Sequence, residues 1–257
     1  MGILVALILG IVQGLTEFLP VSSSGHLFLI SAFFGINQSL FLSVILHVAT
    51  LLAVLFVLRS EIWQMICHPF SKKAINLYTA TIPTVFIVLL FKTKLDGVFE
   101  SGAYLPFFFM LTAVLLFATY ILSKNKKEPD FKKEIKSSSA FFMGLAQGLA
   151  CVPGISRSGS TICTGLLCGE NKKESAKFSF LMSVPIILAS LVYELLFSTE
   201  TIVSIGFLPV LVAFLSAFLV GILSIKFMLK IVEKAKYYYF SIYLFVLSIL
   251  SLIFLKV

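Results

Sequence analysis

The sequence has few charged side chains. Asp, Glu, Lys and Arg make up 12% of its 257 residues, against 59% hydrophobic residues, and its mean hydropathy is +1.06. So little charge excludes a soluble globular domain. The alternation of apolar and polar residues that marks strands is also missing, which disfavours a barrel. A helix needs about 20 apolar residues to cross a bilayer, so we expect an all-α, multi-pass membrane protein.

Two further signals are missing. The four cysteines, Cys67, Cys151, Cys163 and Cys168, show no Cys-x-x-Cys spacing, so a disulfide or metal centre is not expected and they are interpreted as small packing residues. The opening Met-Gly-Ile-Leu-Val lacks a basic region, and we therefore expect no cleaved signal peptide. The net charge of +8 does not indicate a nucleic-acid partner, because the basic residues lie in loops between apolar runs.

The apolar runs differ in length. Residues 1–19 and 25–36 are each too short to span a bilayer, and together they predict a re-entrant hairpin; residues 138–168 are broken in the same way at Pro153. Residues 59–73 are expected at the interface, and residues 123–137 form a charged, solvated loop. The expected full spans cover residues 40–58, 74–91, 103–122, 176–197, 207–229 and 238–255.

The chain repeats itself at an offset of 134 residues. The stretch Gly-Ile-Val-Gln-Gly-Leu from Gly10 returns as Gly-Leu-Ala-Gln-Gly-Leu from Gly144, and Val-Ser-Ser-Ser-Gly from Val21 returns as Ile-Ser-Arg-Ser-Gly from Ile155. We therefore predict one integral membrane domain, 1–257, with halves of about 1–122 and 138–257 joined by loop 123–137. Each half is a broken re-entrant helical hairpin plus three transmembrane helices, and Gly-x-x-x-Gly in each hairpin permits close helix contact.

Three spans per half is an odd number, so the two repeats must be inverted in the membrane. With loop 123–137 in the cytoplasm, 16 of the 20 Lys and Arg residues lie on the cytoplasmic side and three lie outside. This bias predicts that the first hairpin enters from outside and the second from the cytoplasm, so that their breaks meet near the midplane.

Polar side chains gather at the first break. Gln13 and Glu17 share one helix face, Pro20 ends the helix, and a cluster of hydroxyls and an imidazole follows. The hydroxyls sit where the N-cap of the next helix is expected. This cluster comprises Ser22, Ser23, Ser24 and His26.

Arg157 is the basic residue that we place at membrane depth, where arginine costs about 2.5–3.5 kcal/mol and needs a partner or a ligand. The hydroxyls and the helix start around it are typical of a phosphate site. The candidate phosphate-binding residues are Ser22, Ser24, Gly154, Ser156, Ser158 and Thr161. Plainer interpretations remain open, because Glu17 and Arg157 would also suit a buried ion pair. His47, alone in an apolar span, is interpreted as structural.

At these residues the sequence resembles the bacterial undecaprenyl-diphosphate phosphatase family of the bacitracin-resistance type. The stretch from Gln13 to Glu17 matches the first family motif, Glu or Gln, three residues, then Glu, and Pro153 to Thr161 matches Pro-Gly-x-Ser-Arg-Ser-x-x-Thr at every fixed position. The resemblance implies a hydrolase that removes the terminal phosphate of undecaprenyl diphosphate, recycling the carrier for cell-wall synthesis and conferring antibiotic resistance. It also implies a divalent cation, Mg²⁺ or Ca²⁺, for which Glu17 and Gln13 are the candidate ligands.

The predicted catalytic residues are Glu17, Ser23, His26 and Arg157. Ser23 is the expected nucleophile with His26 and Glu17 as base and acid, and direct attack by His26 is the competing assignment. The rival function is a transporter or flippase of the lipid carrier, which would bind the phosphate without cleaving it. We expect a site open to the extracytoplasmic side of the bacterial inner membrane. The expected partners are the polyprenyl diphosphate and membrane lipids, with a homodimer as an open alternative.

Overall fold

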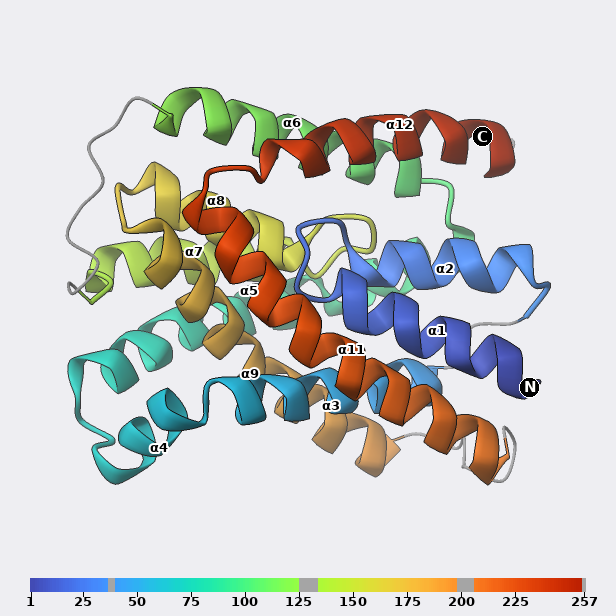
Figure 1. Ribbon diagram of the computed structural model, residues 1–257, viewed down its shortest axis with the longest axis horizontal. Coiled ribbons are helices and arrows are strands. Elements are labelled where there is room, and N and C mark those ends of the chain that lie inside the picture. The colour runs from blue at the N-terminus through green and yellow to red at the C-terminus, as the bar shows by residue number, and fades with distance from the viewer. Residues whose placement is uncertain (37–39, 125–133, 198–205, 256–257) are drawn as a thin grey trace.

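The computed structural model describes residues 1–36, 40–124, 134–197 and 206–255, and within these ranges the regular secondary structure is helical (Figure 1). The helices differ widely in length, as the apolar runs predict. In chain order they are α1 (Ile3–Thr16), α2 (Ser23–Phe33), α3 (Leu40–Val57), α4 (Arg59–Cys67), α5 (Lys72–Ser101), α6 (Leu105–Ser123), α7 (Ser137–Leu149), α8 (Arg157–Leu167), α9 (Lys172–Phe197), α11 (Phe207–Glu233) and α12 (Tyr238–Leu255).

Both predicted breaks are confirmed. Helix α1 ends just before Glu17, and α2 starts after its N-cap Ser22, whose side chain accepts the Gly25 N–H at 3.4 Å. Helix α8 starts in the same way after Ser156, whose hydroxyl accepts the Gly159 N–H at 3.0 Å. A hydroxyl therefore caps the second helix of each hairpin and fixes where its N-terminus lies.

Five of the described helices are long and apolar enough to cross a membrane, and α3 with α4 forms a sixth candidate if the pair, bent by 81°, is one span. Large apolar side chains also point outward. On α5, Ile82, Phe86 and Leu90 recur every four residues and are 58–70% exposed. A stripe of this kind suits lipid rather than water. The multi-pass membrane prediction is therefore confirmed. Most of the predicted charged loop, residues 125–133, lies outside the described residues.

The first helix of each hairpin packs along a long helix from the other half of the chain. Gly10 of α1 lies so close to α11 that an added Cβ would overlap the Ala213 carbonyl oxygen. Gly144 of α7 lies equally close to the Ala80 carbonyl oxygen of α5. The close helix contact expected from each Gly-x-x-x-Gly is thus confirmed, and it carries the broken hairpins into the centre of the helix bundle.

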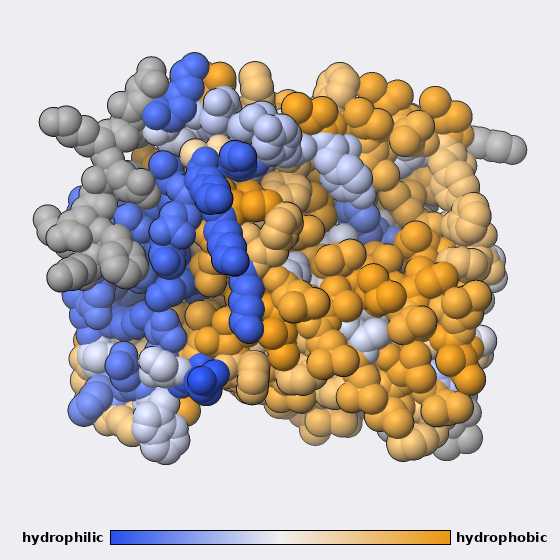
Figure 2. Space-filling view, viewed as in Figure 1, coloured by the Kyte–Doolittle hydropathy of each residue, from blue (hydrophilic) through white to orange (hydrophobic). Residues whose placement is uncertain are grey.

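The hydrophilic residues gather at one end of the molecule. Figure 2 shows a hydrophilic zone at the end where α3 leads into α4, and an apolar surface over much of the rest of the face in view. The N- and C-terminal ends of the chain lie at the opposite end in Figure 1. The face in view therefore has a polar end, where α3 leads into α4, and an apolar belt beside it.

Candidate functional site

The ends of the two hairpins meet at a cavity of about 390 Å³. Its walls combine polar groups from both breaks with side chains from α3, α5 and α9. A pocket of this size, largely apolar with a few converging polar groups, is the usual form of a small-molecule site. Its lining comprises Thr16, Glu17, Ser22, Ser23, Ser24, Ser43, Val44, His47, Val88, Gln147, Ala150, Cys151, Ile155, Ser156, Arg157, Ser158, Ser183, Ile186, Ile187 and Ser190.

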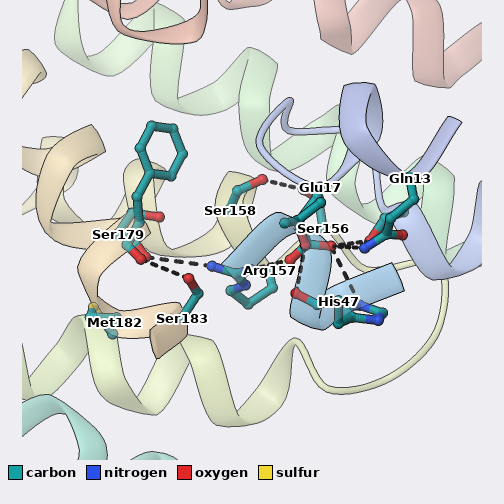
Figure 3. A network of polar contacts seen from close by, with 12 residues as sticks. Gln13, Glu17, His47, Ser156, Arg157, Ser158, Ser179, Met182 and Ser183 are labelled. Atoms are coloured by element: carbon teal, nitrogen blue, oxygen red, sulfur yellow. Dashed lines mark hydrogen bonds and ion pairs between the residues drawn. The ribbon is translucent and has the colours of Figure 1, made fainter. Parts of the chain in front are cut away.

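Glu17 is the centre of the polar network in this pocket (Figure 3). One carboxylate oxygen, Oε1, pairs with Arg157 Nη2. The other, Oε2, accepts the Ser23 hydroxyl at 2.6 Å and the Gln13 amide at 3.1 Å. The side chain of Glu17 is 4% exposed, and a buried carboxylate needs such partners to remain in its charged form.

His47 of α3 also reaches Glu17, with 3.4 Å between Nε2 and Oε2. Its other nitrogen, Nδ1, donates to the Ser43 carbonyl oxygen at 2.7 Å, which leaves Nε2 to face the carboxylate. The sequence alone led us to interpret His47 as structural. In the structure, His47 lines the pocket and contacts the carboxylate of Glu17.

Arg157 is the first residue of α8, so its side chain starts at the break of the second hairpin. Besides pairing with Glu17, it donates from Nη1 to the Ser179 carbonyl oxygen of α9 at 3.5 Å. A guanidinium carries five N–H donors, and its side chain is 18% exposed at the pocket wall. An anion in the pocket would therefore meet the fixed positive charge of Arg157, which has more N–H donors than Glu17 and Ser179 use.

The two capped helix starts also face the cavity. Ser22 and Ser23 open α2, and Ser156 and Arg157 open α8, and all four line the pocket. The first N–H groups of a helix lack intrahelical acceptors and carry a partial positive charge. Two such ends aimed at one cavity make a binding site for an anion with several oxygens.

Not all predicted site residues line the cavity. Gly154 donates its N–H to Ser22 Oγ at 3.1 Å and so joins the two hairpins. Thr161 is buried and its hydroxyl pairs with the Ser179 hydroxyl at 2.6 Å. Both stand directly behind the lining, while Ser24, Ser156 and Ser158 belong to it.

His26 lies outside the cavity lining as well. It is 8% exposed, and both ring nitrogens are engaged at 2.7 Å, Nδ1 with the Ser22 carbonyl oxygen and Nε2 with the Tyr243 hydroxyl. A ring held in this way has no nitrogen directed at a ligand in the pocket. Between His26 and His47, the geometry brings His47 to Glu17.

Comparison with known proteins identifies the family of the chain. A sequence model of the family described as "Bacitracin resistance protein BacA" matches residues 6–250. The chain belongs to this family. It is 39% identical to an undecaprenyl-diphosphatase of Carboxydothermus hydrogenoformans, over 96% of this chain and 95% of the relative. It is 42% identical to an undecaprenyl-diphosphatase of Parabacteroides distasonis, over 93% of this chain and 92% of the relative.

Among the residues that the structure describes, the side chains of this BacA family member do not form a preformed metal site. Across the described ranges, no three side chains among His, Cys, Asp and Glu come together as a metal-binding group. Glu17 is already paired with Arg157 and faces His47 at 3.4 Å, so protein groups already occupy its surroundings. The free oxygen of Gln13, Oε1, is buried without a partner, but Gln13 is not part of the cavity lining. The pair Glu17 and Gln13 alone therefore fits a divalent cation poorly.

Sequence reasoning also left out Gln147, the repeat counterpart of Gln13. Its amide nitrogen donates to the Met182 carbonyl oxygen at 3.3 Å, and its Oε1 is buried without a hydrogen-bond partner. Gln147 lines the pocket, unlike Gln13. The repeat was the signal that could have found it, because Gln147 has the same place in the second hairpin as Gln13, a predicted site residue, has in the first.

Proposed function

We propose that this chain hydrolyses undecaprenyl diphosphate to undecaprenyl phosphate and inorganic phosphate. Such a reaction recycles the lipid carrier for cell-wall synthesis and lowers sensitivity to bacitracin. The observation that carries the proposal is the 2.6 Å hydrogen bond from Ser23 Oγ to Glu17 Oε2, at a cavity where Arg157 and two helix N-termini converge. A hydroxyl beside a carboxylate is an activated nucleophile, and pure binding would not need one.

In the proposed reaction Ser23 Oγ attacks the terminal phosphorus. A bond forms between Oγ and phosphorus, and the bond from phosphorus to the bridging oxygen breaks. Undecaprenyl phosphate leaves with the electron pair, and the hydroxyl proton passes to Glu17 Oε2. Water then attacks the phosphoserine, which releases inorganic phosphate and restores the Ser23 hydroxyl. Glu17, now holding a proton, is placed to return it.

Phosphate oxygens are held by positive groups from both hairpins. The phosphate is bound on one side by Arg157 and the N–H groups at the start of α8, and on the other side by the N–H groups at the start of α2. Charge that develops on the transferring phosphoryl group is stabilised by donors that are already in place. The hydroxyls of Ser24, Ser156 and Ser158 add further donors at the wall.

The prenyl chain is proposed to leave along the apolar part of the cavity. Val44, Val88, Ile186 and Ile187 line it, from α3, α5 and α9. The lining also reaches Ser43 and Ser190, toward the ends of α3 and α9 that lie away from Arg59 and Lys172. If the basic end is cytoplasmic, the cavity opens to the extracytoplasmic side of the cell membrane.

The inverted arrangement of the two repeats is part of the same proposal. It is supported by the packing of each hairpin on the other half of the chain, since α1 packs on α11 and α7 packs on α5. For the divalent cation, we propose that Mg²⁺ or Ca²⁺ would be held mainly by oxygens of the diphosphate, to which Glu17, the carboxylate in the cavity lining, could add an oxygen ligand. A homodimer stays an untested prediction.

A flippase remains the second candidate, because broken helices around a central site are typical of transporters. The test is phosphate release from undecaprenyl diphosphate by purified protein, for wild type and Ser23→Ala. We expect Ser23→Ala to lose turnover by about three orders of magnitude or more and to keep lipid diphosphate binding, since Arg157 and the helix starts are untouched. Wild-type protein that binds the lipid and releases no phosphate would favour the flippase.

A further inference from the structure

Ser22, the residue directly before Ser23, has a backbone conformation that residues with a Cβ rarely adopt, with φ +68° and ψ 96°. A strained residue of this kind persists only where its surroundings hold it. Ser22 is also the N-cap of α2, so its conformation sets where the first turn of α2 begins. The groups that hold Ser22 therefore also hold the start of α2, where Ser23 donates to Glu17.

Ser22 is held at both its side chain and its carbonyl group. Its hydroxyl oxygen accepts the Gly154 N–H at 3.1 Å and the Gly25 N–H at 3.4 Å. Its carbonyl oxygen accepts the backbone N–H of His26 at 3.2 Å and, at a shorter 2.7 Å, the His26 ring at Nδ1. The ring of His26 is therefore the closest partner of the Ser22 carbonyl group.

His26 is in turn held from α12, at the far end of the chain. The Tyr243 hydroxyl lies 2.7 Å from Nε2, and the two rings stack with 5.7 Å between centroids and 16° between planes. Phe109 meets the same imidazole edge-on. A carbonyl oxygen can only accept, so Nδ1 carries the hydrogen, and in the neutral ring Nε2 accepts the Tyr243 hydroxyl.

We propose that Tyr243 is a positioning residue for the reaction. Its hydroxyl fixes the orientation and the tautomer of His26. His26 then holds the Ser22 carbonyl group, and Ser22 keeps Ser23 within hydrogen-bond distance of Glu17. The proposal rests on hydrolysis by Ser23, and it gives His26 a positioning role in place of the chemical one expected from the sequence. It also links the rate of the reaction to α12, from which no residue lines the cavity.

The first test replaces Tyr243 by Phe, which removes the hydroxyl and keeps the ring on His26. We expect kcat for phosphate release to fall about fivefold, the scale of one neutral hydrogen bond, with KM unchanged because no phosphate contact is lost. The matched control is Tyr239→Phe, the same change at an exposed position on the same helix. Equal kcat values for the two variants would overturn the proposal.

The second test separates a positioning His26 from a chemical one. An Asn side chain places its amide N–H close to the position of Nδ1, so His26→Asn keeps a donor for the Ser22 carbonyl oxygen. A Gln side chain places its amide N–H near the position of Nε2 instead. We expect His26→Asn to keep more activity than His26→Gln, and Tyr243→Phe to have no further effect in the His26→Asn background. Loss of activity in His26→Asn to the level of Ser23→Ala would overturn the proposal.

The third test needs no activity. Labelling the imidazole nitrogens with ¹⁵N in detergent-solubilised wild type reports the tautomer of each ring, and the signal of His26 is identified as the one missing in His26→Asn. The proposal requires a neutral His26 with hydrogen on Nδ1, and hydrogen on Nε2 would overturn it even if Tyr243→Phe failed to fold. Wild type that shows this tautomer and releases no phosphate would instead count against the proposed function.

Discussion

Arg157 touches both Glu17 and the Ser179 carbonyl group, so its planar guanidinium connects the two hairpins with α9. Replacement by Lys keeps the charge and loses the fork that binds two oxygens at once. We expect kcat/KM for phosphate release to fall about a hundredfold, the scale reported for one removed oxyanion donor. The matched control is Arg59→Lys, at the polar end of the bundle, where the guanidinium stacks on Phe56. Near-wild-type activity of Arg157→Lys would mean that Arg157 acts only as a counter-ion of Glu17.

His47 gives the second prediction at this scale. Its Nε2 lies 3.4 Å from the same Glu17 oxygen that accepts the Ser23 hydroxyl. In His47→Leu the carboxylate loses one neighbouring polar group, and we expect kcat to fall about tenfold, the scale of one polar contact to a charged group. His68→Leu, at an exposed position after α4, is the control. The measurement is again phosphate release, and equal rates for the two variants would contradict a role for His47.

The residues that sequence reasoning brought together lie at the two breaks of the repeat. Glu17 and Ser23 flank one break and Arg157 opens the other, so the repeat alone was enough to place them side by side. His47 stands by itself in an apolar span, and nothing in its neighbours indicates what it faces. An ionisable side chain inside a span is nevertheless a signal of a functional site, and giving it more weight would have found His47.

At the scale of elements, the Gly-x-x-x-Gly faces decide how deeply the hairpins enter the bundle. Replacement of Gly10 by Val would drive a branched side chain into the Ala213 carbonyl group of α11. We expect Gly10→Val to lower the free energy of unfolding by about 1–3 kcal/mol, the usual cost of overpacking, and to lower Tm in detergent. Gly2→Val is the control, since a Cβ at Gly2 meets nothing within 4 Å. An unchanged Tm would mean that α1 and α11 separate easily.

Most helix boundaries were predictable, although α5 (Lys72–Ser101) continues past the expected end at residue 91, whereas helix partners were not predictable. Pro20 and the serines after it mark the first break, and the expected span 238–255 agrees with α12 (Tyr238–Leu255). A glycine face shows that another backbone comes close, without specifying which one. The pairing of α1 with α11 and of α7 with α5 depends on contacts between residues far apart in the sequence. A single sequence does not reveal such contacts.

At the scale of the whole molecule, the distribution of lysine and arginine predicts which end faces the cytoplasm. Two native cysteines can test this prediction. Cys67 is exposed at the end of α4, close to the predicted cytoplasmic lysines Lys72 and Lys73, and Cys151 lines the cavity that we propose opens outward. In two variants that each keep one of these cysteines, an anionic membrane-impermeant methanethiosulfonate should reach Cys151 in right-side-out vesicles and Cys67 in inverted vesicles.

The physical reason is that the bilayer separates two aqueous compartments, and a small anion crosses neither the apolar belt nor the closely packed hairpin helices. Cys151 neighbours Arg157, which should favour the approach of an anionic reagent from the cavity mouth. A variant that keeps only Cys163, which is buried, should react from neither side and serves as the control. Labelling of Cys67 and Cys151 from the same side would refute the outward-opening cavity, and with it the proposal that the diphosphate is cleaved at the extracytoplasmic face.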